Sequence, residues 1–115
     1  MALSLTIAQL FAPTVLTTGA ATLYTNSGVS GSVLVNGRIR VANTSAATHQ
    51  VTLYAVPSGG SAGAGNCFAN AESIAQNQHL DFDVPQLPVG ATLQALADAG
   101  SVLTVTALAG TLITP

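Results

Sequence analysis

The chain has 115 residues, one cysteine and 5% charged residues. This length fits a single domain that is large enough to bury a core, and the lone Cys67 excludes an intrachain disulfide and a cysteine-based zinc site. Two basic residues are too few to neutralise many phosphates, so we expect no direct nucleic-acid binding. A hydrophobic content of 49% with a net charge of −2 argues against disorder.

Alternating runs of Val, Leu and Thr, separated by turn residues, predict β-strands along the whole chain. Strands at this spacing indicate a β-sandwich or barrel and not βαβ units. Two segments, 66–76 and 92–99, also fit short helices, but such helices are marginal without packing, and we favour strands there. In chain order the predicted strands cover residues 3–10, 14–17, 21–24, 32–43, 49–56, 67–74, 79–84, 92–97 and 102–114.

The N-terminal segment, residues 1–13, is apolar, and we expect it to form an arm or an edge strand that pairs with a neighbouring molecule. The alternative is an ordinary first strand of a sandwich formed by residues 14–115. The segment has no basic residue, and Gln9 and Pro13 interrupt it, so it does not predict a signal peptide. The chain has no run of 18 apolar residues that would predict a membrane span and no Lys/Arg-rich face that would predict membrane binding.

The dipeptide Asn36-Gly37 raises a question of register, because it is a strong signal for a tight hairpin. A continuous strand instead places Val33, Val35, Gly37, Ile39 and Val41 on one face and Leu34, Asn36, Arg38 and Arg40 on the other. This partition separates apolar from charged groups more cleanly. We therefore favour one continuous strand, with a bulge at Gly37 as an option.

The predicted strand 79–84 places His79, Asp81 and Asp83 on one face. Residues two apart on a strand are separated by about 6.6 Å, so one strand cannot bring all three to a single metal ion. A solvated polar face is the favoured interpretation, and a divalent site or a pH-sensitive subunit contact at His79 is the alternative.

Arg38 and Arg40 share one face of their strand and are the only basic residues. Two guanidiniums can hold a carboxylate across an interface. They can equally form cross-strand ion pairs with Asp81 and Asp83 inside the domain, which we favour.

The run Gly59-Gly-Ser-Ala-Gly63 matches the pattern of a nucleophilic serine at Ser61. That chemistry needs a tight turn between a strand and a helix, whereas this run lies in a Gly/Ser/Ala loop. We expect no enzyme activity, no catalytic residue, no metal and no cofactor.

Four runs resemble small virion proteins of tailed bacteriophages: RIRVANTS (38–45), VTLYAVPSGG (51–60), LQALA (93–97) and VLTVTALAG (102–110). The resemblance covers about residue 39 to the C-terminus. It implies a structural role, as a capsid decoration (cement) protein with a jelly-roll or Ig-like fold or as a tail or fibre component.

A weakly charged surface also suits a subunit packed into a larger particle, because free cytosolic proteins usually keep more charge. A Thr- and Ala-rich domain that tolerates low charge is the alternative.

We therefore expect a single, all-β sandwich of about eight antiparallel strands, jelly-roll-like or Ig-like. We expect a decoration protein on the outer surface of the virion, made in the host cytoplasm, that bridges subunits of the major capsid protein as a dimer or trimer. The alternative is a tail, baseplate or head-fibre component acting as an adaptor or host-binding module. The expected assembly contacts are Leu3, Leu5, Ile7, Leu10, Phe11, Arg38 and Arg40.

Overall fold

The computed structural model describes residues 4–7 and 10–115, which form strands joined by turns and one short 3-10 turn, η1 (Ala64–Asn66). No α-helix occurs in these residues, and none of their helical segments has the length and apolar character to cross a membrane. The strands are β1 (Ser4–Ile7), β2 (Thr14–Val15), β3 (Ala21–Thr25), β4 (Val33–Asn43), β5 (His49–Val56), β6 (Cys67–Ile74), β7 (His79–Val84), β8 (Leu87–Pro88), β9 (Thr92–Ala97) and β10 (Leu103–Thr114).

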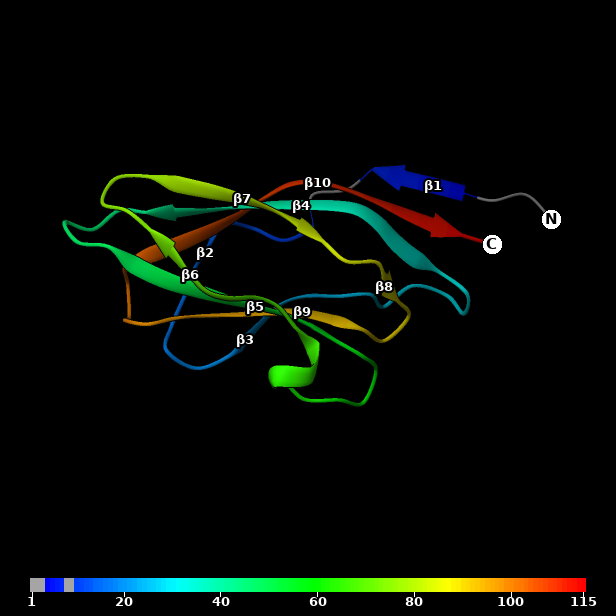
Figure 1. Cartoon of the computed structure of the whole chain (residues 1–115). Coiled ribbons are helices and arrows are strands. Elements are labelled where there is room, and N and C mark those ends of the chain that lie inside the picture. The colour runs from blue at the N-terminus through cyan, green and yellow to red at the C-terminus, as the bar shows by residue number, and fades with distance from the viewer. Residues whose placement is uncertain (1–3, 8–9) are drawn as a thin grey trace.

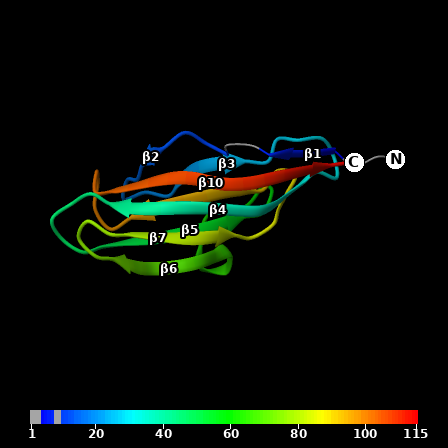
Figure 2. The same cartoon turned by 90° about the horizontal axis from the view of Figure 1, so that it is seen from above.

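The strands form two antiparallel sheets that pack face to face (Figures 1 and 2). Sheet A has the order β1-β10-β4-β7, with β2 also paired to β10 and β8 to β4; sheet B has the order β3-β9-β5-β6. The pairs nest, because β5 pairs with β6, β4 with β7, β3 with β9, and β1 and β2 with β10. A long hairpin folded over into two sheets in this way is a jelly roll, which confirms the predicted β-sandwich.

The core lies between the two sheets and is aliphatic. Ile39 and Val105 from sheet A meet Leu53 and Leu93 from sheet B, and all four are fully buried. Burial of each such side chain stabilises the fold by about 1.5–3 kcal/mol. Every second residue of the central strands supplies this core, which is why the alternating pattern predicted them.

Most predicted strands are confirmed, and four of them agree with the structure residue for residue: β5, β6, β7 and β9. The helical alternatives for residues 66–76 and 92–99 are not realised, since both segments are strands. The described residues hold ten strands, of which β2 and β8 have two residues each. The sequence did not predict β8, whose Leu87 pairs with Leu34.

β4 is continuous across Asn36-Gly37, as favoured; the predicted division of its faces is confirmed for residues 36–41 but was wrong for residues 33–35. Leu34 is 1% exposed and lies in the core, whereas its neighbours Val33 and Val35 are half-buried. The cause is a bulge, because the register of β4 and β10 shifts beside Asn36, which adopts a left-handed φ of 54°. One extra residue reverses the alternation of faces on its N-terminal side.

Gly37 is required beside this bulge because there is no space for a side chain at this position. A Cβ atom there would lie 2.9 Å from Cβ of Val84 on the neighbouring strand, which is closer than two carbon atoms can pack. The backbones of β4 and β7 therefore approach closely where the hollow described below begins.

Asn43 closes the end of β4 with a buried network. Its Nδ2 donates to the carbonyl oxygens of Ala47 (2.7 Å) and Ile74 (2.8 Å), and its Oδ1 accepts from the backbone N–H and the hydroxyl of Ser45. This side chain joins the β4–β5 turn to the end of β6. The Asn-Thr-Ser run that contributed to the phage resemblance therefore has a structural role.

Candidate functional site

The outer face of sheet A carries four of the six acidic and basic residues of the chain. Arg38 lies opposite Asp83, and Arg40 lies opposite Asp81, across the β4–β7 pair. We call these four residues the charged ladder. Its positive members all lie on β4 and its negative members all lie on β7.

The inner rung of the ladder is a tight ion pair. Arg40 donates from Nε to Oδ1 of Asp81 (2.7 Å) and from its terminal nitrogen to Oδ2 (3.1 Å). This hydrogen bonding lowers the pKa of the Asp81 carboxyl and raises the pKa of Arg40. The bidentate geometry confirms the predicted intramolecular pairing for Arg40.

The outer rung is loose. A terminal nitrogen of Arg38 lies 3.8 Å from Asp81, and its Nε lies 4.0 Å from Asp83. Both separations exceed hydrogen-bonding distance, and the Arg38 guanidinium has no hydrogen bond to any residue that the structure describes. The two side chains are 55% and 92% exposed, so this rung keeps free donors and acceptors at the surface.

His79 lies on the same face of β7 as Asp81 and Asp83, as the alternation predicted. Leu80, Phe82 and Val84 are paired with buried residues of β4 and lie on the same side of the sheet as these, toward sheet B, although Leu80 is still 37% exposed. Within residues 4–7 and 10–115, no group of three or more His, Cys, Asp or Glu side chains is close enough to hold a metal ion.

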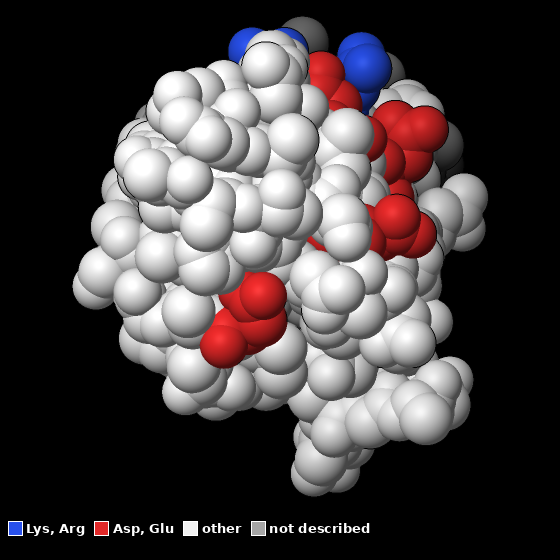
Figure 3. Space-filling model, turned by 60° about the vertical axis from the view of Figure 1, so that its left-hand side comes forward, with Lys and Arg blue, Asp and Glu red and all other residues white. Residues whose placement is uncertain are grey.

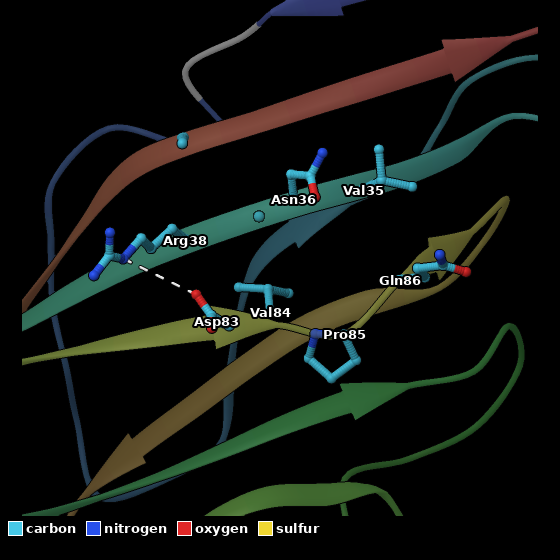
Figure 4. A pocket seen from close by; sticks show the side chains of 9 residues that line it. Val35, Asn36, Arg38, Asp83, Val84, Pro85 and Gln86 are labelled. Atoms are coloured by element: carbon cyan, nitrogen blue, oxygen red, sulfur yellow. Dashed lines mark ion pairs between the residues drawn. The ribbon is translucent and has the colours of Figure 1, made fainter.

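A hollow of about 500 Å³ lies next to the loose rung (Figure 4). Its walls are residues 35–38 of β4, residues 83–86 and Ala109. Residues 37–42 of β4 pair with β7, and residues 33–34 pair with β8. Residues 35 and 36 pair with neither strand, so the sheet opens there. Figure 4 shows Arg38 and Asp83 reaching toward each other at one end of the hollow, with Val35 and Gln86 at the other end.

Beyond the hollow, sheet A continues past the end of sheet B. Figure 1 shows β1 and the end of β10 reaching beyond the lower sheet, and we call this part the overhang (Ser4–Ile7, residues 33–35 and 111–114). Leu5, Ile113 and Val33 form one row of the register across three strands. Val33 and Ile113 are half-buried on the outer face, opposite to the core side of Leu34. The overhang therefore presents apolar groups beside the ladder.

The structure brings most of the predicted assembly residues to sheet A. Leu5 and Ile7 lie in β1, which pairs with β10 of the same chain and is therefore the first strand of the sandwich, as the alternative had it; its pairing with a neighbouring molecule stays a prediction. Leu10 is buried against Gly110, and Phe11 is half-buried against the core, so these two stabilise the domain itself. Leu3 lies outside the described residues.

The remaining surface has little charge. In Figure 3 the blue guanidiniums, which belong to the only two basic residues, lie together at the top beside red carboxylates, and most of the visible surface is uncharged. Elsewhere, Nδ1 of His49 lies 2.9 Å from Oδ1 of Asp98. The sequence did not predict this pair, because His49 begins β5 and Asp98 follows the end of β9, far apart in the chain.

Sheet B has a smaller hollow of about 320 Å³, lined by Tyr54, Ala64, Cys67 and Asn70. The loop that contains Ser61 lies between β5 and η1, and the carbonyl of Ser61 accepts a hydrogen bond from Asn66. A single 3-10 turn and a strand follow it, so this loop differs from the strand–turn–helix that a nucleophilic serine uses.

No protein-family model matches the chain, and comparison with curated proteins gives no significant match. Its function therefore has to be argued from the fold and from the surface of sheet A.

Proposed function

We propose that the protein is a structural component of a tailed-phage virion, a decoration protein that binds the outer capsid and bridges major capsid subunits. The observation that carries the proposal is the outer face of sheet A, where a charged ladder, a hollow and an apolar overhang adjoin on an otherwise weakly charged jelly roll. Jelly rolls are a recurrent architecture of viral capsid domains. That fold-level analogy and the sequence resemblance support the proposal.

The mechanism would be mechanical. A decoration protein spans neighbouring capsid subunits and opposes their separation, and each contact can be weak because symmetry repeats it over the particle. The overhang suits such a contact, since it combines an edge strand with half-buried apolar side chains.

The copy number per particle tests the proposal. We expect quantitative mass spectrometry of virions of the phage that encodes the chain to find about as many copies as major capsid subunits, or a fixed fraction set by the capsid symmetry. A count of about six or twelve copies would instead indicate a tail, baseplate or head-fibre component, as the symmetry of those structures requires. Absence from virions would overturn both assignments.

A further inference from the structure

The charged groups of the loose rung, unlike those of the tight rung, remain available to another molecule. Arg40 is bidentate to Asp81, whereas Arg38 has only two long contacts and no hydrogen bond to a described residue. Asp83 is 92% exposed on the outermost strand of sheet A. A guanidinium and a carboxylate that are both incompletely paired can each accept a partner from another molecule.

The register of the ladder makes this face complementary to itself. The positive residues form a row on β4, and the negative residues form a row at the same levels on β7. A twofold axis that runs along the strands, midway between β4 and β7, places the β4 row of one copy over the β7 row of the other. Arg38 then faces Asp83 of the second copy, and the same contact is repeated in reverse, as a twofold interface requires.

We propose that this face is a self-association surface, on which two copies of the chain pair through reciprocal Arg38–Asp83 contacts. The inference deepens the proposed function, on which it rests for its biological setting, by naming a second copy as the partner of the charged half of sheet A. The overhang stays free for the capsid. Because two strands overlap in this arrangement, the interface is small, and we expect the pair to dissociate in the micromolar range and to be reinforced by repetition on a particle.

Charge reversal offers a test that separates pairing between copies from pairing within one copy. Arg38→Asp leaves two acidic groups at the rung, and Asp83→Arg leaves two basic groups, so each variant repels a second copy of itself. An equimolar mixture of the two variants restores both contacts, since every acidic group then faces a basic group of the other chain. An ion pair that acts only within one chain cannot recover on mixing.

Sedimentation velocity of the full chain, from micromolar to millimolar concentration, measures the association. We expect the wild type to form dimers, each reversal variant to raise the dissociation constant by about tenfold or more, and the mixture to recover the wild-type value. Glu72→Arg, which makes the same change in charge as Asp83→Arg on exposed β6 of sheet B, is the matched control and should dimerise normally.

Two results would overturn the inference: a monomeric wild type throughout this range, or single variants that fail to recover when mixed. Circular dichroism checks that each variant keeps its strands. If Arg38→Asp does not fold, the milder Arg38→Gln should still weaken the dimer, and unchanged dimerisation of that variant would also count against the interface. If the protein is monomeric in solution but is present in virions at the expected copy number, the self-association alone is refuted. If it dimerises but is absent from virions, the decoration role alone is refuted.

Discussion

Arg38 and Arg40 are two residues apart on one strand, yet their surroundings give them different tasks. The fork of Arg40 matches the carboxylate of Asp81 with both oxygens engaged. Arg38 instead makes two long contacts, one of 3.8 Å to that same carboxylate and one of 4.0 Å to the exposed Asp83. Surface ion pairs contribute little unless the geometry is bidentate, so Arg40 is the arginine that matters for the fold.

The substitution Arg40→Gln tests this at the residue scale. It removes the hydrogen bonds that lower the pKa of Asp81, so that pKa should rise toward its ordinary value, which an NMR titration of the carboxyl group measures. The lowered pKa of Asp81 in the folded state stabilises the protein at pH values above about 4, the ordinary pKa of aspartate. This stabilisation is lost as the pH falls through the lowered pKa.

The free energy of unfolding, measured by urea denaturation, should therefore differ between wild type and Arg40→Gln at neutral pH. The difference should shrink as the pH falls below about 4. Arg38→Gln serves as the control and should change the pKa of Asp81 less, because its nearest approach to that carboxylate is 3.8 Å. Equal shifts in both variants would contradict the distinction between the two arginines.

At the scale of single elements, the bulge in β4 decides which side chains reach the core. Alternation along residues 33–41 predicted a continuous strand but placed Leu34 with the charged residues. The structure reverses this, because Asn36 takes a left-handed conformation and adds one residue to the strand. Asn-Gly was recognised as a turn signal, and the local pattern alone could not show that the same signal marks a bulge here.

The bulge leads to a prediction that differs from simple alternation. Leu34→Ala should cost about 2–5 kcal/mol in the free energy of unfolding, because it leaves a cavity around a side chain that is 1% exposed. Val35→Ala, on the half-buried outer face, should cost less than about 1 kcal/mol. Chemical denaturation of the two variants measures both values, and a larger loss for Val35→Ala would mean that the register across Asn36 is wrong.

The candidate site could be predicted only in part. Strand alternation placed His79, Asp81 and Asp83 on one face, and the pairing of the two aspartates with the arginines was a favoured expectation. The hollow could not be predicted, because it depends on where β4 changes partner from β7 to β8. β8 itself has two residues, Leu87 and Pro88, and so short a segment carries no periodic pattern.

At the scale of the whole molecule, the middle of sheet A and its overhanging end differ in surface chemistry. The middle carries the ladder, whereas the overhang presents Val33 and Ile113 beside β1. If the overhang is the part that contacts the capsid, a charge there should weaken binding without unfolding the domain, because Val33 is not in the buried core.

Val33→Asp should therefore lower the amount of protein that co-sediments with capsids stripped of the decoration protein, by about tenfold or more at limiting concentration. Val15→Asp is the matched control, since Val15 is 53% exposed on β2 at the other half of β10. Normal binding by Val33→Asp, with its thermal unfolding unchanged, would assign the capsid contact to another face.

One consequence of the topology concerns how the protein is made. β10 follows every other strand in the chain, yet it is the partner of β1, β2 and β4 in the middle of sheet A. At a synthesis rate of about 5–20 residues per second, β10 is made several seconds after the first strands. Sheet A can close only after translation has passed β10, so a chain interrupted before β10 lacks the strand that joins β1, β2 and β4, although all four strands of sheet B have already been made.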